Sequence, residues 1–499
     1  MKAVYLLVFL LFYAWEHPAT HAIDVATIAA NGFHNDRVRR VVDLTSSVVK
    51  EKITLKATNM GGKPMDRYYF TIPSAYKDHI AYHQAYHLPY GLSNEDLAIT
   101  YIGIDSKVGL HVFAVQLDKP VNSAEQLKIG INLSYVHFIG PFPAKIPQLS
   151  KQHVTFIGTI FLVSPYETSE IKSTFKFPSN RVDSNLLEGV SYDSKVVGNT
   201  IIYGTFKDVP PFTKARGSFH YEYLKPMVTI TRLERHMEVS HWGGNMGVEE
   251  HYDLQNDGAD LNSIPKDATD IYYRDEVGNV STSHFRKEIT KSYLQIQPRF
   301  PVYGGWRSSW YMGHNVPLRQ FLRHDSKADR KYILKVNLVD NVKEKTINDI
   351  EFKVTLPEGA TDIELSVPPH IEFDSIEKTM HFTYFDSVGR PTIVFRKTYV
   401  VSDHEVPIFI SYNYSTLRLL QKPLVTSSAI FFLFLLSICA SKFLWTVTSD
   451  IAKVSDTVTQ PSNEKQQVFT ESKTLQSLST NSVGLNATIK KRKQQKKKK

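Results

Sequence analysis

The sequence has 499 residues, 59 Lys and Arg against 50 Asp and Glu, and one cysteine, which gives a formal net charge of +9. One cysteine excludes an intrachain disulfide and a four-cysteine zinc site, and the composition of 42% hydrophobic and 22% charged residues is typical of a globular chain. The length indicates two or three domains, and the net positive charge suggests nucleic acid as one kind of partner to consider.

The amino terminus has the form of a secretory signal peptide. Met1-Lys2 is a short positive start, and Ala3–Tyr13 is an apolar run too short to span a bilayer. Small side chains at Thr20 and Ala22 suit a signal peptidase, so we predict a signal peptide over 1–22. An uncleaved anchor or a buried helix is the alternative interpretation.

Within the next 400 residues, 23–422, segments recur in which apolar and polar positions alternate with the period of β-strands. The clearest predicted strands are 42–48, 350–356, 381–385, 392–396 and 408–414. Met237–Trp242 and Val248–Leu254 flank Gly243-Gly244, which predicts a β-hairpin. Strands with frequent turns are typical of β-sandwiches.

Helical candidates are few, namely Ala75–Tyr86 and Val316–Arg323. Paired prolines in Asp208–Thr213 interrupt the strand pattern, so we place a domain boundary at about residue 220. The prediction is therefore a mainly β chain with two β-sandwich-like domains, 23–220 and 221–422. No short internal repeat is evident.

Pro423–Ser441 contains no charged residue and is bracketed by Lys422 and Lys442. A helix over this stretch, at about 1.5 Å per residue, is long enough for the hydrocarbon core of a bilayer. We predict a transmembrane helix over 423–441, and a buried core helix is the alternative. A signal peptide with one late span predicts a single-pass type I protein whose residues 23–422 are lumenal.

The predicted cytosolic tail, 442–499, holds 12 Lys or Arg and 4 Asp or Glu, so almost the whole excess of positive charge lies there. The charge thus indicates membrane orientation and no specific nucleic acid. Low apolar content predicts disorder. Lys496 and Lys497, fourth and third from the carboxyl end, resemble a dilysine signal for retrieval to the endoplasmic reticulum. The alternatives are tethering to anionic lipid or to ribosomal RNA.

Catalytic motifs are scarce. His79, His83 and His87 would share one face of a helix, but no HExxH pattern or carboxylate ligand accompanies them, so we predict no metal site and a polar surface. The sequence has no nucleophile elbow, no phosphate-binding glycine loop and no dinucleotide fingerprint. We predict no catalytic residue and no cofactor, and a standalone hydrolase is the minority alternative.

Four N-x-Ser/Thr sequons are present. Asn279 follows Gly278 in a predicted exposed turn, so we predict a glycan there in preference to Asn132, which lies in a strand-like run, and Asn413, which lies close to the predicted span. Asn486 falls in the predicted cytosolic tail and should remain unmodified.

Several segments resemble the ribophorin I family, which is subunit 1 of the oligosaccharyltransferase complex. The most specific is Tyr272–His284 (YYRDEVGNVSTSH), which includes Tyr273, Arg274, Asp275 and Glu276. The others in the second half are Val239–Gly243, Pro298–Pro301 with Gly304–Trp306, Leu356–Ala360 and Tyr384–Pro391; the first half matches more loosely through Ser46–Glu51, Ser164–Tyr166 and Asp208–Pro210.

The resemblance implies a non-catalytic subunit of the complex that transfers a dolichol-linked oligosaccharide to Asn of N-x-Ser/Thr. It implies other oligosaccharyltransferase subunits as partners, including a multispanning catalytic one, together with nascent polypeptides, the endoplasmic reticulum membrane and, more weakly, the translocon and ribosome. It also implies that Asn279 is the family's glycan position. An independent type I lumenal receptor or chaperone for nascent glycoproteins is the alternative.

Two departures from the family pattern are visible. The connection Gln255–Thr269 is shorter than in family members, which indicates a missing surface excursion or a gap in the gene model. The tail is also shorter than in animal members, which puts ribosome docking in doubt. Of the tryptophans, we expect Trp242 to fill a sandwich core, and leave Trp306 and Trp310 open between core and binding surface.

Overall fold

The computed structural model describes residues 32–458 apart from 89–95, 106, 145, 147–150, 189–192, 256–259, 265–268, 281–283, 288–291, 297, 300–304, 326–329, 341, 343, 384 and 385. The predicted signal peptide and the tail beyond Val458, including Lys496 and Lys497, lie outside these residues. The chain forms two compact units, Met1–Thr426 and Ser427–Lys499. Within the first unit the chain is mainly β, which confirms the predicted fold class.

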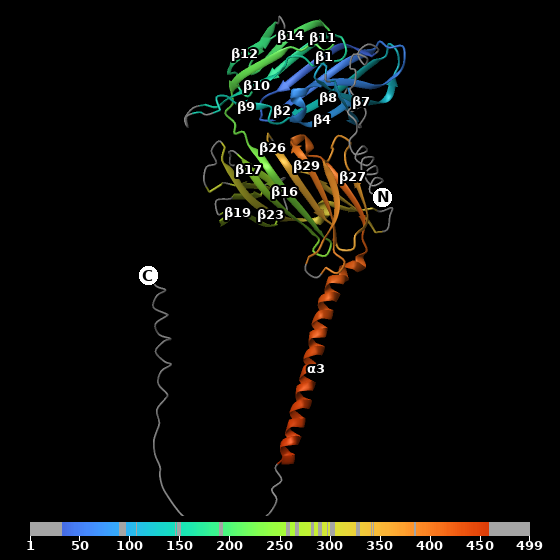
Figure 1. Ribbon diagram of the computed structural model, residues 1–499, viewed down its shortest axis with the longest axis vertical. Helices are drawn as coiled ribbons and strands as arrows, with labels where there is room; N and C mark the ends of the chain where they lie inside the picture. The colour runs from blue at the N-terminus through green and yellow to red at the C-terminus, as the bar shows by residue number, and fades with distance from the viewer. Residues whose placement is uncertain are drawn as a thin grey trace, which may run out of the picture. The chain divides into compact units, whose positions relative to one another are not determined.

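The N-terminal half of the first unit runs from β1 to β15 (Figure 1). Its strands are β1 (Phe33–Asp43), β2 (Val49–Asn59), β3 (Met65–Pro73), β4 (Ile80–His87), β5 (Asp96–Leu97), β6 (Ile99–Asp105), β7 (Leu110–Val121), β8 (Gln126–Tyr135), β9 (Ile139–Pro141), β10 (His153–Thr159), β11 (Thr168–Lys176), β12 (Val182–Glu188), β13 (Ser194–Val197), β14 (Thr200–Val209) and β15 (Arg216–Glu222). One 3-10 helix, η1 (Ser74–His79), precedes β4.

The C-terminal half runs from β16 to β30. Its strands are β16 (Thr229–Ser240), β17 (Asn245–Gln255), β18 (Asp260–Ile264), β19 (Thr269–Asp275), β20 (Gly278–Asn279), β21 (His284–Lys287), β22 (Ser292–Ile296), β23 (Arg307–Pro317), β24 (Leu322–His324), β25 (Lys331–Asn337), β26 (Thr346–Thr355), β27 (Thr361–Ser366), β28 (Ser375–His381), β29 (Arg390–Val400) and β30 (Pro407–Asn413). The 3-10 helices are η2 (Leu318–Gln320), η3 (Ser402–His404) and η4 (Thr416–Leu420).

The two halves repeat one topology. The eight-stranded sheet of the first half has the order β13-β14-β11-β1-β2-β8-β4-β5, and that of the second has β28-β29-β26-β16-β17-β23-β19-β20. Adding 15 to every strand number converts the first order into the second, and the same holds for the four-stranded and three-stranded sheets. Among the described residues, each strand pairing of the first half therefore has a counterpart in the second.

Each eight-stranded sheet contains a parallel pair next to a hairpin. In the first half β1 pairs parallel with β11 and antiparallel with β2, and in the second half β16 pairs in the same way with β26 and β17. The apolar core of the first half ends at Tyr223, and that of the second begins at Val228. The repeat therefore coincides with two separate hydrophobic cores.

A buried ion pair is also repeated. Arg40 of β1 donates from Nε to Glu51 Oε1 of β2 at 2.5 Å, and its guanidinium lies 6.0 Å from the ring centre of Phe175 on β11. In the second half Arg235 Nε lies 3.0 Å from Glu250 Oε1, and its guanidinium lies 5.7 Å from the ring centre of Phe352. Both pairs are almost fully buried.

The predicted hairpin around Gly243-Gly244 is confirmed, because Ser240 at the end of β16 pairs with Asn245 at the start of β17. The predicted strand 42–48 is wrong, because β1 ends at Asp43 and the chain turns. Asp43 Oδ1 accepts hydrogen bonds from both the N–H and the hydroxyl of Thr45, at 3.0 and 2.6 Å. Apolar alternation continues through this turn because Leu44 and Val48 are buried.

Neither predicted helix forms. Ala75–Tyr86 divides between η1 and β4, because β4 pairs with β8 and β5. Val316–Arg323 contains the end of β23, the single turn η2 and the start of β24. The strand predicted at 381–385 does not form over 382–383, since β28 ends at His381, and 384–385 lie outside the described residues. The predicted strand 392–396 lies in β29, and 408–414 overlaps β30. In the two segments predicted to be helical, pairing with neighbouring strands determines the conformation despite the helical spacing of apolar residues.

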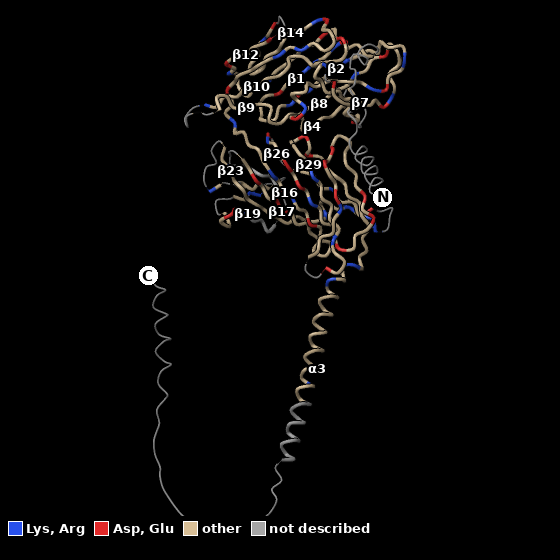
Figure 2. Tube along the Cα trace, in the orientation of Figure 1, with Lys and Arg blue, Asp and Glu red and all other residues tan. Residues whose placement is uncertain are grey.

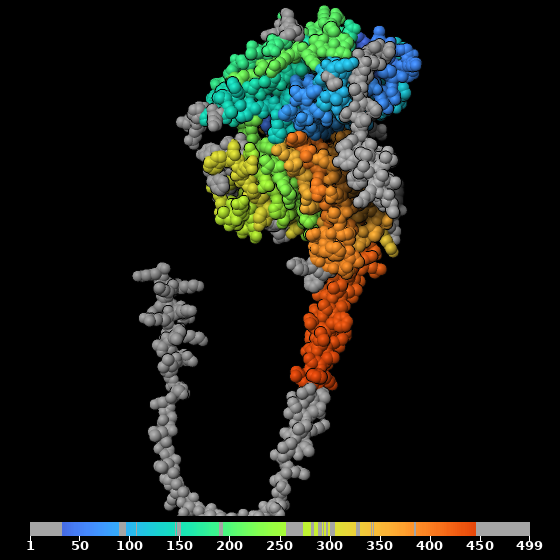
Figure 3. All heavy atoms as spheres, viewed as in Figure 1, coloured from blue at the N-terminus to red at the C-terminus, as the bar shows by residue number. Residues whose placement is uncertain are grey.

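The halves contact each other end to end (Figure 3). Val48, from the turn between β1 and β2, is buried in an apolar cluster with Val401. Lys50 Nζ lies 2.9 Å from Asp403 Oδ2, and Ser134 Oγ donates to the same oxygen at 2.9 Å. The β1–β2 end of the first sheet therefore packs on the end of the second sheet where β26 begins and β29 ends.

The second unit is one long helix as far as it is described. α3 spans Gln421–Val458 and contains a stretch long and apolar enough to cross a membrane. Figure 2 shows the uncharged part of this helix in tan. α3 begins two residues before the predicted span 423–441 and continues for 17 residues after it, so the first part of the predicted disordered tail is helical.

Candidate functional site

The favoured sequon lies in a tight turn between β19 and β20. Asp275 Oδ1 accepts hydrogen bonds from the N–H groups of Val277 and Gly278, each at 3.0 Å, which is an Asx turn. Gly278 has a φ of 128°, a backbone conformation that favours glycine. The turn leaves Asn279 exposed immediately after it.

Two arginines hold this turn. Arg299 Nε donates to Asp275 Oδ2 at 2.5 Å, and its Nη2 donates to the carbonyl oxygen of Asn279 at 2.9 Å. Arg274 Nε donates to Asn279 Oδ1 at 2.7 Å. The hydrogen bond from Arg299 lowers the pKa of Asp275. Arg299 thus joins two segments that are separate in the sequence, 272–284 and 298–301.

A second set of motif residues meets at the start of α3. Glu358 Oε1 accepts hydrogen bonds from the N–H groups of Ser387 and Val388, at 2.6 and 2.9 Å, and from Gln421 Nε2 at 3.1 Å. Lys422 Nζ lies 2.7 Å from the buried Asp386 Oδ1. We call these five residues and Asp386 the α3 anchor: Glu358, Asp386, Ser387, Val388, Gln421 and Lys422. It ties two turns to the first two residues of α3, immediately before the predicted span.

Arg390 connects the α3 anchor to the β16–β17 hairpin. This buried side chain donates from Nη2 to the carbonyl oxygen of Val239 at 2.7 Å and from Nε to that of Leu356 at 3.3 Å. It also forms an ion pair with Glu238. Arg390, which lies in the segment Tyr384–Pro391, therefore hydrogen-bonds to the segments Val239–Gly243 and Leu356–Ala360, and all three resemble the ribophorin I family.

A cavity of about 160 Å³ lies beside this arginine. His241 and Tyr414 form part of its wall with their rings stacked at 4.5 Å, and His241 Nε2 is 2.7 Å from Tyr412 Oη. Burial lowers the pKa of His241 to about 4, so the ring is neutral near pH 7. Glu358 Oε2 is buried without a hydrogen-bond partner, which leaves one strong acceptor in the wall.

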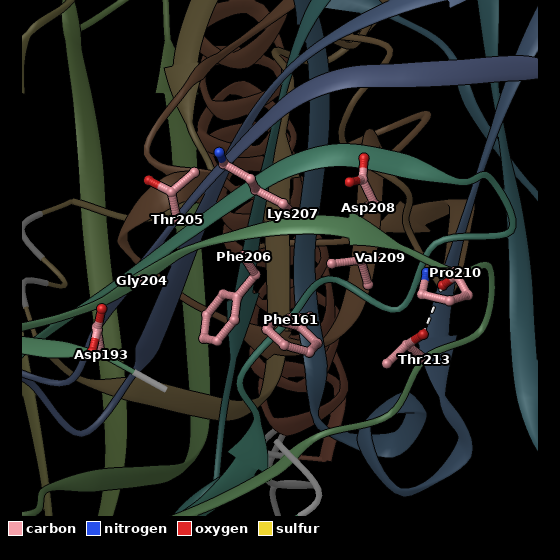
Figure 4. A pocket seen from close by; sticks show the side chains of 10 residues that line it. All are labelled: Phe161, Asp193, Gly204, Thr205, Phe206, Lys207, Asp208, Val209, Pro210 and Thr213. Atoms are coloured by element: carbon pink, nitrogen blue, oxygen red, sulfur yellow. Dashed lines mark hydrogen bonds between the residues drawn. The ribbon is translucent and has the colours of Figure 1, made fainter. Parts of the chain in front are cut away.

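The N-terminal half has a larger open groove of about 500 Å³ along β14 (Figure 4). Phe161 and Phe206 pack edge to face at 4.5 Å in its lining. Asp193, Lys207 and Asp208 supply charge around these rings. Such a mixed lining provides apolar contact and a few polar groups, but it holds no arrangement of nucleophile, base and orienting group.

The three histidines do not share a helix face, because His79 ends η1 and His83 and His87 lie on the strand β4. His79 Nδ1 is 2.9 Å from the carbonyl oxygen of Val136, and His87 Nε2 is 3.2 Å from Asp118 Oδ2, so these two rings have separate partners. Burial, with help from Lys397, lowers the pKa of His83 to about 4. Within the described part of the chain, no group of three His, Cys, Asp or Glu is placed to hold a metal ion.

The signature residues take different places. Tyr273 is buried, Arg274 and Glu276 are exposed, and the side chain of Tyr272 lies outside the described residues. Trp242 was expected in the core, and that expectation is wrong: it is 77% exposed, because it occupies the β16–β17 turn. Trp306 is half exposed.

Trp310, the tryptophan left open between core and surface, packs against the second core and stacks on Tyr252 at 5.1 Å. The two other candidate sequons lie in strands. Asn132 of β8 donates from Nδ2 to Gln84 Oε1 at 3.3 Å, and Asn413 of β30 donates to Asp362 Oδ2 at 2.8 Å. Both side chains are partly exposed.

Sequence reasoning missed the residues that join the motifs: Arg299, Glu358 and Arg390. Each lies inside a quoted segment, and each is a charged residue next to proline or glycine. A charged side chain in such a turn is a signal for local backbone capping, but its distant partner is set by the fold.

Known proteins are similar to this chain over a range that includes these segments. The family model described as Ribophorin I matches residues 33–264 and 262–441. The chain belongs to the ribophorin I family. The two matched stretches overlap at 262–264, inside the connection Gln255–Thr269.

Curated relatives in this family carry consistent names. "Dolichyl-diphosphooligosaccharide–protein glycosyltransferase subunit 1" of Caenorhabditis elegans is 30% identical over 455 residues, covering 86% of this chain and 75% of that protein. Subunit 1B of Oryza sativa subsp. japonica is 31% identical over 432 residues, covering 79% of this chain and 88% of that protein. Subunit 1B of Arabidopsis thaliana is 28% identical, covering 80% and 90%.

Solved structures give weaker likenesses. Yeast LTA4 hydrolase overlaps with a TM-score of 0.27 at 8% identity, over 42% of this chain and 32% of that one. An M1 zinc metallopeptidase from Deinococcus radiodurans overlaps with a TM-score of 0.24 at 10% identity, over 42% and 44%. Overlaps at this level do not establish a shared fold.

Proposed function

We propose that this ribophorin I family member is a non-catalytic accessory subunit of the oligosaccharyltransferase complex in the endoplasmic reticulum membrane. It would support transfer of a dolichol-linked oligosaccharide to Asn of N-x-Ser/Thr in nascent proteins. The observation that carries the proposal is the family match over residues 33–441, which includes both β halves and most of the apolar stretch of α3.

The proposed topology is single-pass type I. Residues 23–220 and 221–422 would form two lumenal domains after removal of 1–22, and 442–499 would face the cytosol. The basic residues after the span support this orientation, since Lys and Arg concentrate on the cytosolic side of membrane proteins. Lys496 and Lys497 would serve retrieval to the endoplasmic reticulum.

The mechanical role that suits this architecture is a scaffold. The buried pairs Arg40–Glu51 and Arg235–Glu250 tie the central strands of both halves, and the end-to-end contact joins the halves. Such a body can hold a multispanning catalytic subunit and receive nascent polypeptides near the membrane. The catalytic residues would lie in that other subunit, while the translocon and ribosome would be weaker partners.

An independent lumenal receptor or chaperone for nascent glycoproteins is the second candidate. The open groove along β14, with its two phenylalanine rings and charged side chains, favours this function because it offers a surface for peptide or glycan. Both functions place the protein in the same membrane.

Affinity purification distinguishes the two. The full chain, tagged after Lys499 with a copy of its last ten residues behind the tag, is extracted in mild detergent from cells that lack the native copy. We expect the multispanning catalytic subunit to copurify, and sequon occupancy in reporter glycoproteins to fall when the chain is depleted. Normal occupancy and no catalytic subunit in the eluate would favour the receptor.

A further inference from the structure

The repeat of the two halves identifies an end of the fold that is covered in one half and open in the other. In the N-terminal half, Val48 of the β1–β2 turn is 2% exposed because the C-terminal half packs on it. Ser47 Oγ in the same turn donates to the carbonyl oxygen of Glu344 at 2.9 Å. The β1–β2 end is thus an interface.

The matching end of the C-terminal half carries the β16–β17 turn. There Trp242 is 77% exposed, in the turn that corresponds to the one holding Val48. Phe382 and Val388, from the loop between β28 and β29, are 64% and 49% exposed at the same end. A Cβ added to Gly389 would lie 2.8 Å from Phe382 Cζ, so this ring lies close to the loop backbone.

This end is fixed close to the first residues of α3. Gln421 and Lys422 bind Glu358 and Asp386 through the α3 anchor, and one cavity is lined by both Trp242 and Lys422. Lys422 is the last charged residue before the apolar run, so it belongs at headgroup level if α3 crosses the bilayer. Side chains bound to it lie within a few ångströms of the same level.

The chemistry of the end suits a lipid surface. Tryptophan and phenylalanine are stable at the boundary between headgroups and acyl chains, where an apolar ring need not be covered by protein. The exposed Arg418, in η4 just before α3, supplies a cation for lipid phosphate.

We propose that the end of the C-terminal half formed by the β16–β17 turn and the β28–β29 loop rests on the bilayer surface, with Trp242 and Val388 among the lipid headgroups. The occupant of this open end is the membrane itself. The proposal rests on α3 being the membrane span, and the experiment below measures that condition separately.

Lipid quenching of site-specific probes tests it. The full chain carrying Cys439→Ser is given one new cysteine, by Trp242→Cys or Val388→Cys, labelled with an environment-sensitive dye and reconstituted alone into phosphatidylcholine vesicles. Val277→Cys is the matched control, because Val277 is 81% exposed and follows Asp275, which pairs with Trp310. Trp310 and Pro317 are roughly 23 Å apart along β23, so the control lies at the far end of the sheet.

Headgroup-linked quenchers should reduce the dye signal at 242 and 388 roughly threefold more than at 277, as expected for side chains at the interface. Equal quenching at all three positions would overturn the proposal. Protection of 242 and 388 from both lipid-linked and aqueous quenchers would also overturn it, since a protein surface would then cover them.

Leu433→Cys, in the middle of the apolar run, serves as the reference for the span. Quenching of the 433 probe by acyl-chain quenchers, together with no quenching at 242 or 388 by headgroup-linked quenchers, would refute the docked surface alone. No acyl-chain quenching at 433 would instead refute the span on which both proposals depend. An unchanged thermal unfolding midpoint shows that each labelled variant is folded. If Trp242→Cys does not fold, Val388→Cys still tests the proposal.

Discussion

Glu51 and Glu250 hold matching places in the two halves of the chain. Glu51 lies opposite Val42 in the β1–β2 ladder, and Glu250 lies opposite Arg235 in the β16–β17 ladder. Phe175 and Phe352 lie opposite the same two residues on the parallel side. In the second half the arginine of the ion pair, Arg235, lies directly opposite the glutamate. In the first half that position is Val42, and the arginine of the ion pair is Arg40, two residues earlier in β1.

The two glutamates differ in what would remain after their removal. Arg40 would keep the carbonyl oxygen of Thr159 as an acceptor, whereas Arg235 would keep Asp340 and two carbonyl oxygens at 3.2 Å. Burial raises the pKa of Glu250, while Arg235 opposes that rise. Removing the glutamate is therefore more costly in the first half.

We expect Glu51→Ala to lower the free energy of unfolding by about 3–5 kcal/mol, the cost of leaving a buried charge unpaired. Glu250→Ala should cost about 2 kcal/mol, since a charged partner remains. Denaturant unfolding of the full chain in detergent measures both. Glu51→Gln, which keeps an acceptor for Arg40 and Tyr135, is the control and should fall between wild type and Glu51→Ala. Equal losses for the two alanine variants would contradict the argument.

Local features of the fold could be predicted from the sequence, and long-range ones could not. Gly243-Gly244 between alternating strands predicts a hairpin because both arms are adjacent in sequence. The parallel pairing of β1 with β11 joins Asn35 to Thr168, and nothing in either segment specifies the other. The repeat of the two halves is therefore invisible in the residues, although it is complete in the strand order.

The candidate sites divide in the same way. The sequon at Asn279 and the signature around Asp275 are visible as residues, but the contact with Arg299 depends on the loop that brings 298–299 back to the turn. The spacing of His79, His83 and His87 is that of one face of a helix, yet the segment Ile80–His87 forms strand β4 because it pairs with β8. Trp242 is apolar and yet exposed, because a two-glycine hairpin places it outside the core.

Asn279→Gln should remove one glycan from the protein made in cells. Asn279 is exposed and directly follows the Asx turn, whereas Asn132 and Asn413 lie in the longer strands β8 and β30 and are only partly exposed. Gel mobility before and after glycosidase treatment measures the change. Asn132→Gln and Asn413→Gln are the matched controls and should leave mobility unaltered. A mobility shift for either control, or none for Asn279→Gln, would refute the assignment.

Glu358→Ala should loosen the α3 anchor. The N–H groups of Ser387 and Val388 both donate to the lost oxygen, so two backbone donors lose their acceptor. We expect a loss of about 2–4 kcal/mol in the free energy of unfolding. Cleavage within 382–389 during limited proteolysis should also accelerate. Gln421→Ala removes a single side-chain donor to the same oxygen and should cost about 1 kcal/mol or less, without faster cleavage.

Acidification should weaken the contact between the halves through two histidines, the buried His404 and the partly buried His83. Burial, with Lys397 nearby, lowers the pKa of His83 to about 4 and that of His404 to about 3. The N–H of Val401 donates to His404 Nδ1 at 3.1 Å, which requires an unprotonated nitrogen. His83 lies on β4 of the N-terminal half. His404 lies in η3 of the C-terminal half and packs against Tyr82 of β4, with ring centres 5.2 Å apart. Both histidines therefore lie at the contact between the halves.

Between about pH 6.5 and pH 4 the unfolded chain binds more protons at these sites than the folded chain does, so stability rises with pH. Their contribution is fully present above pH 6.5 and is lost as the pH falls toward the folded pKa values. Each site can change the free energy of unfolding by about 3 kcal/mol at most over this range. Thermal unfolding midpoints at pH 7 and pH 5 measure the effect.

His83→Leu isolates one of the two sites. It removes the titrating ring while keeping an apolar side chain beside Phe113, so the difference in midpoint between pH 7 and pH 5 should shrink. His251→Leu, in which an exposed histidine is replaced, is the control and should retain the wild-type difference. If His83→Leu showed the full wild-type loss at pH 5, protonation at this position would not be what destabilises the contact.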